Sequence, residues 1–209
     1  MGLWERRATL VVTALIAIGA PRAQVIEFES GGLHYRTLTR DGFTVMFAGL
    51  PSHMRDYSII QVAVSNGSPI SWTVKPEDFS FHRPDGIVIT ATPAAEVVNS
   101  LMARASRKDV INLVTAYESG IYGNPHLKSM TGGYESRRRN ALAEVGSPKL
   151  KAAAAASAIA LVATRLYPGD STDGAVFFAS NGKPLGPGKL IVHAAAQDFE
   201  FDAEGMPAK

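Results

Sequence analysis

Apolar and polar residues alternate with a period of two along the first part of the chain. The apolar positions 60, 62 and 64 are separated by polar or small residues, and the same alternation recurs over 70–74 and 79–81. Alternation of this kind places successive side chains on opposite faces of a β-strand. Short alternating runs divided by turns are typical of an antiparallel β-sandwich or barrel. Turn-forming residues divide these runs at 41–42, 66–69 and 85–86.

From Pro93 onward the apolar period becomes that of amphipathic helices. Val97, Leu101 and Ala105 share one helical face, and residues 106–109 form a capping box at the start of the next helix. Five consecutive alanines, 152–156, predict a helix of little side-chain bulk that packs closely against its neighbours. The pattern predicts four helical segments, over residues 97–105, 110–121, 134–145 and 149–158.

The period of two returns near Ala160. Strands are predicted over 164–167, 175–178, 190–194 and 199–201, with a bulge or turn between Ala195 and Asp198 because the apolar parity changes there. The strands on either side of the helices are too few to close a core separately, so we expect one domain over 24–209 with helices inserted at 94–158. Aromatic residues on the apolar strand faces are expected in its core: Trp72, Phe79 and Phe178.

The order of three motifs resembles a known family. Residues 62–70 read as a strand ending in an Asn turn, residues 76–86 as a Phe strand followed by a Gly turn, and residues 166–178 as a Pro-Gly turn before a Phe strand. This order is similar to that of the telokin-like immunoglobulin-fold domains of unknown function, found in bacterial secreted proteins and lipoproteins. The resemblance implies an immunoglobulin-like β-sandwich with a binding or scaffolding role, and it brings no catalytic residues. The helices at 94–158 and the missing lipoprotein cysteine depart from the family.

The first 23 residues have the composition of a secretory signal peptide. Two arginines precede a mostly apolar run over 8–20, and cleavage is predicted after Ala23. The run is shorter than the roughly 20 apolar residues that a membrane span needs. We therefore expect cleavage and a periplasmic or extracellular location, with retention as an anchor as the alternative.

The charge and the cysteine content of the chain argue against several classes of function. The chain has 21 Lys and Arg against 19 Asp and Glu, and three of the basic and one of the acidic residues lie in the first 23. Residues 24–209 therefore hold 18 of each and are neutral, which disfavours a nucleic-acid partner. The chain contains no cysteine, which excludes disulfides, cysteine nucleophiles and thiolate metal sites.

No residue pattern predicts catalysis, a cofactor or a metal. The five histidines lack the spacing that places two imidazoles on one metal ion, and no nucleophile, base and orienting residue form a recognisable set. Asp198, Glu200 and Asp202 alternate with phenylalanines, which predicts a solvated outer strand face, although calcium could use such oxygens.

The segment around 122–138 is the only one in which Tyr, Asn and Arg concentrate, and these residue types are common in binding surfaces. We predict an exported, non-enzymatic, immunoglobulin-like binding or scaffolding module with a protein or glycan partner in the cell envelope. The alternatives are an envelope component that assembles through its edge strands, and a hydrolase or metal-dependent enzyme whose site forms only on folding. The predicted partner-binding residues are Tyr122, His126, Tyr134 and Arg138.

Overall fold

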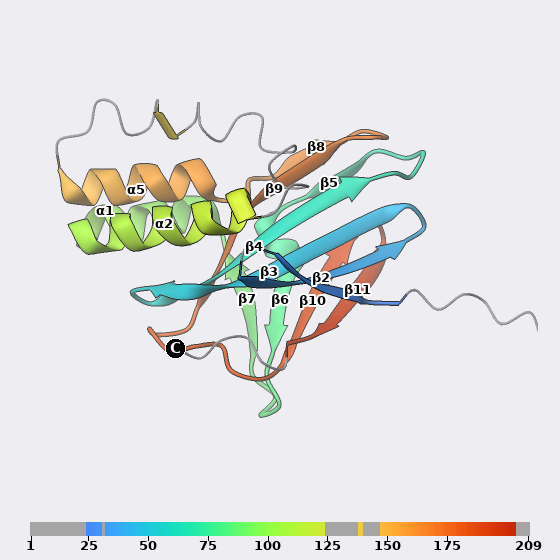
Figure 1. The fold of residues 1–209 in the computed structure, drawn as a ribbon, viewed down its shortest axis with the longest axis horizontal. Helices are drawn as coiled ribbons and strands as arrows, with labels where there is room; N and C mark the ends of the chain where they lie inside the picture. The colour runs from blue at the N-terminus through green and yellow to red at the C-terminus, as the bar shows by residue number, and fades with distance from the viewer. Residues whose placement is uncertain (1–23, 31, 124–137, 140–146, 204–209) are drawn as a thin grey trace, which may run out of the picture.

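The computed structural model describes residues 24–30, 32–123, 138–139 and 147–203, and within them the fold is mainly β (Figure 1). Nine strands form one sheet in which every neighbouring pair is antiparallel, in the order β1-β2-β3-β4-β9-β7-β6-β10-β11. Their bounds are β1 Ile26–Ser30, β2 Leu33–Arg40, β3 Phe43–Met54, β4 Tyr57–Asn66, β6 Phe79–His82, β7 Val88–Thr92, β9 Ser171–Ala179, β10 Lys189–Ala194 and β11 Gln197–Asp202. A separate two-stranded sheet pairs β5 (Trp72–Val74) with β8 (Thr164–Leu166).

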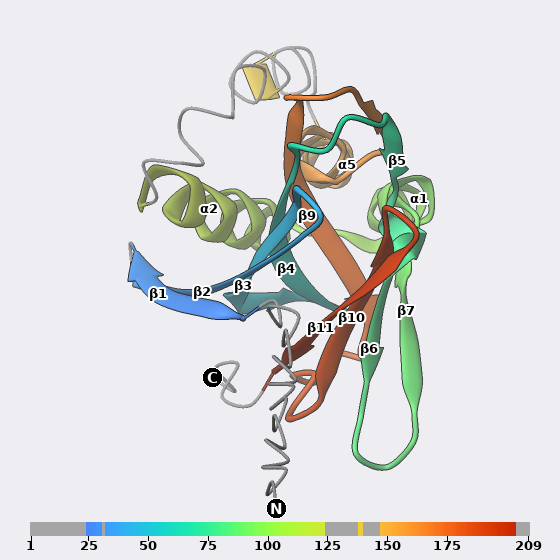
Figure 2. The same ribbon diagram turned by 90° about the vertical axis from the view of Figure 1, so that its right-hand side faces the viewer.

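The large sheet curls until its two halves face each other (Figure 2). The halves meet where β9 pairs with β7, through only two residue pairs. Phe43 and Phe47 on β3 contact Phe199 and Phe201 on β11, with ring centroids 5.8 and 5.0 Å apart. Aromatic rings from opposite halves of the sheet therefore fill the space inside the curl, and among the described residues this is the larger of the two apolar cores.

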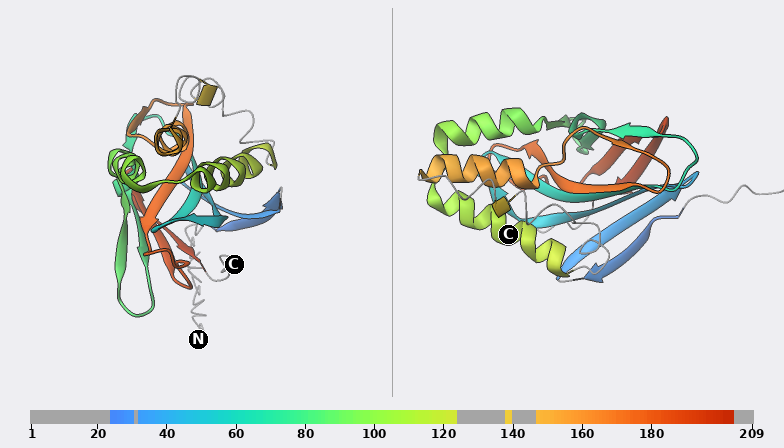
Figure 3. Two further views of the ribbon diagram at one scale, coloured as in Figure 1. Left: turned by 90° about the vertical axis from the view of Figure 1, so that its left-hand side faces the viewer. Right: turned by 90° about the horizontal axis from the view of Figure 1, so that it is seen from above.

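The outer face of β1–β4 and β9 is covered by helices and forms a second core. The helices are α1 (Ala94–Arg104), α2 (Arg107–Gly123) and α5 (Pro148–Ile159), and α5 lies between the other two (Figure 3). Most of the alanines of α5 are buried, as predicted, and their small side chains let the three helices pack closely over the sheet.

Strands β4 and β9 are consequently buried on both faces. Ile60 and Val62 point into the curl, whereas Gln61 and Ala63 lie under the helices, with 1% and 4% of their surfaces exposed. The sequence pattern indicated a strand with one apolar and one polar face. The helix layer explains the difference, because it covers the face that alternation marks as solvent-exposed.

The predicted helices and turns are largely confirmed where the structure describes them. In chain order α1, α2 and α5 lie between β7 and β8, and α5 ends at Ile159 with a single bridge from Ala160 to Ala175. The change of parity after β10 is a two-residue hairpin turn at Ala195 and Ala196, both with positive φ. The predicted signal peptide at 1–23 and most of the predicted helix 134–145 lie outside the described residues.

Two of the three aromatic residues expected in the core are fully buried. Phe79 and Phe178 have no exposed surface. Trp72 only packs against the edge of this core and stays partly exposed. The reason is that β5 belongs to the small sheet at the end of the molecule, so Trp72 closes that end instead of filling the centre. No helix of the described residues is long and apolar enough to span a membrane.

The junction between α1 and α2 is tied to the β3–β4 hairpin by Asp109. Its carboxylate accepts hydrogen bonds from the Ser106 backbone N–H at 2.6 Å, the Ser106 hydroxyl at 2.7 Å and the Arg55 guanidinium Nε at 3.0 Å. The Asp109 backbone N–H donates in return to the Ser106 hydroxyl, which completes the predicted capping box. Burial acts to raise the pKa of Asp109, but these hydrogen bonds outweigh it and lower the pKa below its ordinary value of 3.8.

We expect Asp109→Asn to lower the free energy of unfolding by about 1 kcal/mol at neutral pH. Because the folded-state pKa is lowered, the stability contributed by the carboxylate is complete above pH 3.8 and is lost as the pH falls through the lowered value. The difference in unfolding free energy between wild type and variant should therefore shrink as the pH falls through the lowered pKa of Asp109. Urea unfolding of both proteins from neutral to acidic pH measures this difference in unfolding free energy. A difference that is independent of pH would contradict this role of the Asp109 charge.

Candidate functional site

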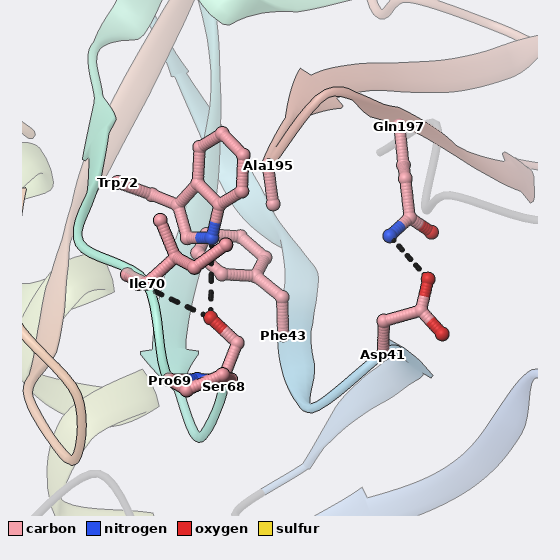
Figure 4. A pocket seen from close by; sticks show the side chains of 8 residues that line it. All are labelled: Asp41, Phe43, Ser68, Pro69, Ile70, Trp72, Ala195 and Gln197. Atoms are coloured by element: carbon pink, nitrogen blue, oxygen red, sulfur yellow. Dashed lines mark hydrogen bonds between the residues drawn. The ribbon is translucent and has the colours of Figure 1, made fainter.

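Three chain reversals meet at one end of the curled sheet and enclose a pocket of about 240 Å³ (Figure 4). They are the β2–β3 turn, the loop from β4 to β5 and the β10–β11 turn, which are far apart in the sequence. We call this cavity the turn pocket. Its lining residues are Asp41, Phe43, Ser68, Pro69, Ile70, Trp72, Ala195 and Gln197.

The loop from β4 to β5 is held by the buried side chain of Asn66. Its amide nitrogen donates to the carbonyl oxygens of Ile70 at 2.8 Å and Leu166 at 3.1 Å. Its amide oxygen accepts from the backbone N–H of Ser68 at 3.1 Å and from the Ser68 hydroxyl at 2.6 Å. The Trp72 indole N–H donates to the same hydroxyl at 3.1 Å. One side chain at the end of β4 therefore fixes the wall that carries Ile70 and Trp72.

This loop touches the β2–β3 turn backbone to backbone. Gly67 N–H donates to the Gly42 carbonyl at 2.8 Å, and a Cβ atom on Gly67 would lie 2.9 Å from that oxygen. Gly42 also has a φ of +80°, in the region that favours glycine. Both glycines are thus required where the two reversals meet. The sequence marked Asp41-Gly42 and Asn66-Gly67 as turns, but not that they contact each other.

The β10–β11 turn is joined to the β2–β3 turn on the opposite side of the pocket. The Arg40 guanidinium donates to the Asp198 carbonyl oxygen at 2.6 Å, and the Gln197 amide nitrogen donates to the Asp41 carboxylate at 2.7 Å. The guanidinium also lies over the Phe199 ring, 5.9 Å from its centroid. Hydrogen bonds across the fold therefore hold both walls in place.

The two walls differ in how many of their hydrogen-bond donors and acceptors are already used within the protein. On the loop wall, the Ser68 hydroxyl and the Trp72 indole N–H bond to each other, and the Ser68 hydroxyl also bonds to Asn66. On the turn wall, Asp41 and Gln197 share one hydrogen bond, so further carboxylate lone pairs, an amide oxygen and a second amide hydrogen remain. The pocket thus combines an apolar wall with a wall that can both accept and donate.

No family model, curated protein or solved structure matches the chain. The resemblance of residues 62–70, 76–86 and 166–178 to telokin-like domains therefore stays a prediction.

Two of the four residues predicted to bind a partner, Tyr122 and Arg138, are described, and both lie away from the turn pocket on the helical side of the molecule. Tyr122 is in the last turn of α2 and is 47% exposed. The Arg138 guanidinium Nη1 lies 2.7 Å from the Glu118 carboxylate, and 37% of the Arg138 side chain is exposed. His126 and Tyr134 lie outside the described residues. Arg138 is thus drawn to α2 through an ion pair, and the role of these four residues remains a prediction.

The titratable groups of the described residues do not converge on one point. Within these ranges no three histidine or acidic side chains are placed to share a metal ion. The acidic row Asp198, Glu200 and Asp202 is exposed on β11, and Lys189 lies 3.6 Å from Glu200, as expected of a solvated strand face. Asp198 also pairs with His193 across the β10–β11 hairpin.

Sequence reasoning missed the turn pocket because its walls come from distant segments. Ala195 and Gln197 lie more than 100 residues after Trp72 along the chain. Local turn motifs at 41–42 and 66–69 were visible, but each is common in β-proteins. Only the curl of the sheet brings the β10–β11 turn to face them.

Proposed function

We propose that this chain is a non-enzymatic binding module and that the turn pocket holds its ligand. The observation that carries the proposal is an open pocket with an apolar wall, a polar wall and a scaffold already fixed by hydrogen bonds. Binding sites are typically concave, mostly apolar and largely formed before the ligand arrives, with a few placed polar groups. Ile70 supports this role further, because it is a large apolar side chain left 57% exposed at the pocket.

The proposal also covers the cellular location of the protein and its structural relationship to known domains. The basic and apolar pattern of residues 1–23 supports export to the periplasm or the cell exterior. The motif order of the β-strands supports a distant relation of the curled sheet to telokin-like immunoglobulin domains, with the helices as an insertion. A binding or scaffolding role in the envelope agrees with both.

Assembly through edge strands is less well supported. The outer strands of the large sheet, β1 and β11, carry alternating carboxylates at Glu27 and Glu29 and at Asp198, Glu200 and Asp202. In an antiparallel pair of two β1 strands centred on Phe28, Glu27 would face Glu29 of the other copy. Like charges opposite each other destabilise such pairing, and charged edges are a common protection against it.

We expect Ile70→Arg to abolish ligand binding without unfolding the protein. The side chain is exposed, so its replacement removes little buried surface, and the longer arginine can occupy the pocket beside the Asp41 carboxylate. The measurement is a thermal-shift screen of small molecules, sugars and short peptides against wild type. A ligand at 100 times its Kd stabilises the folded state by about 2.7 kcal/mol.

The matched control is Ile111→Arg, which places the same charge at a 55% exposed isoleucine on α2. Ligands that raise the melting temperature of wild type and of Ile111→Arg, but not of Ile70→Arg, support the turn pocket. If every such ligand stabilises Ile70→Arg equally, binding occurs elsewhere and the proposed site is wrong.

A further inference from the structure

We propose that the ligand of the turn pocket is a single neutral sugar ring, free or at the end of a glycan. This inference rests on the proposed binding function and names its ligand class. Pockets for drug-sized molecules measure roughly 300–1,000 Å³. At about 240 Å³ the turn pocket is smaller, so it accommodates one ring-sized group.

The two walls match the two kinds of surface on a sugar ring. Ring C–H groups form an apolar face, which fits Ile70, Pro69 and the partly exposed Trp72. Ring hydroxyls both donate and accept hydrogen bonds. The Asp41 carboxylate accepts, and the Gln197 amide does both, so this pair can serve adjacent hydroxyls. Figure 4 shows the pair on one side of the cavity, opposite Ile70 and Trp72.

A purely apolar ligand fits this pocket less well. It would cover the Asp41 carboxylate and the Gln197 amide without replacing the water that bonds to them. Covering polar groups without new hydrogen bonds costs affinity. The polar wall therefore selects for a ligand that carries its own hydroxyls.

A cationic ligand gains less here than at an isolated carboxylate, because a positively charged side chain lies close to the turn wall. Arg40 precedes Asp41 in the chain, and its guanidinium is held at the same pair of turns by the Asp198 carbonyl oxygen and the Phe199 ring. The Asp41 carboxylate further receives the Gln197 amide N–H. Among the described residues that line the pocket, Asp41 carries the charge, and the nearby Arg40 guanidinium offsets part of its attraction for a second cation.

Tryptophan fluorescence provides a direct test. The chain contains two tryptophans, Trp4 and Trp72, so in a Trp4→Phe variant of the full chain Trp72 is the single emitter. It lines the pocket, and a bound ring should change its emission. The probes are glucose, galactose, mannose and N-acetylglucosamine, their disaccharides, arginine methyl ester as a cation, and cyclohexanol as an apolar ring. A ligand of this size binds with a Kd of about 1 mM, so titrations extend to about 50 mM.

We expect saturable quenching or a spectral shift with at least one sugar, and about tenfold weaker binding in Asp41→Asn and in Gln197→Leu. Asn suits the Asp41 position, where φ is +46°, so the first variant should keep the fold. Asp85→Asn, on the exposed β6–β7 loop, is the matched control and should bind like the parent. Disaccharides that bind better than single sugars would identify a glycan end as the source.

The outcomes separate this inference from the proposed function. If arginine methyl ester or cyclohexanol saturates the Trp72 signal and no sugar does, the pocket binds a ligand but the sugar inference is wrong. If sugars change the signal equally in Asp41→Asn and Gln197→Leu, the polar wall does not recognise them and the inference is also wrong. If no probe alters Trp72 emission and the thermal-shift screen finds no pocket ligand, both proposals are overturned.

Discussion

Replacing Phe178 with alanine is expected to lower the free energy of unfolding by about 3–5 kcal/mol. Phe178 is fully buried on β9, beside the β9–β7 contact where the two halves of the sheet meet. Its ring packs against the ring of Phe81 from the opposite half, with centroids 6.4 Å apart and the two ring planes at 65°. Truncation removes this contact and leaves a cavity that the β-sheet around it cannot collapse to fill.

Urea unfolding followed by far-UV circular dichroism measures this change. Ile111→Ala serves as the control, because Ile111 is a large apolar residue that is 55% exposed and its truncation should shift stability by no more than about 0.5 kcal/mol. A loss below about 1 kcal/mol for Phe178→Ala would show that this face of β9 does not point into the core.

Asn66→Ala is expected to cost about 3 kcal/mol or more and to disorganise the turn pocket. The Asn66 side chain makes four hydrogen bonds, to Ser68, Ile70 and Leu166, and none of its surface is exposed. Alanine leaves the Ser68 N–H and the Leu166 carbonyl without these partners at a site that water does not reach. Each such buried group costs about 1–3 kcal/mol.

The effect should appear in two measurements. Urea unfolding reports the loss of stability, and Trp72 emission shifts to longer wavelength because the indole loses its fixed position beside Ser68. Asn99→Ala is the control: Asn99 is exposed on α1, so the change should be neutral within about 0.5 kcal/mol. A stable Asn66→Ala protein with unaltered Trp72 emission would mean that Asn66 does not hold this loop.

Several features of the fold could be predicted because they depend on neighbouring residues in the chain. Asp41-Gly42 between two apolar runs predicted the β2–β3 hairpin, and the structure pairs Arg40 with Phe43 across that turn. Ser106 and Asp109 predicted a capped start of α2, and both hydrogen bonds of the cap are present. Side chains three residues apart meet whenever a helix begins, whatever the rest of the fold does.

The helix layer could be predicted as amphipathic, but not where it docks. Alternation at 60–64 marked one apolar face, and the pattern left Gln61 on a face expected to be exposed. In the structure Gln61 is buried below the helices, where its amide oxygen lies 3.4 Å from the Tyr35 hydroxyl. A polar residue within a period-two pattern is ambiguous, because a covering layer can bury it if a partner satisfies part of its hydrogen bonding.

The close approach of the α5–β8 connection to β9 also could not be predicted from the sequence. Gly174 is buried, and a Cβ atom there would lie 2.6 Å from the Leu161 backbone. From the sequence alone, Gly174 is one glycine in a strand-like run. Glycine is required at this position because the segment that contains Leu161 folds back onto β9. There the Leu161 N–H donates to the Ala175 carbonyl at 2.9 Å.

The mainly β class, the hairpin turns and the helical faces of this protein could be predicted from local sequence patterns. These follow from backbone preferences and from side-chain periods that act over a few residues. The curl of the sheet, the burial of β4 and β9 on both faces and the pocket lined by Asp41, Trp72 and Gln197 could be seen only in the folded protein. Contacts of this kind join residues more than 100 positions apart, and they depend on the accumulated twist of nine strands and on the packing of whole faces, which no local pattern records.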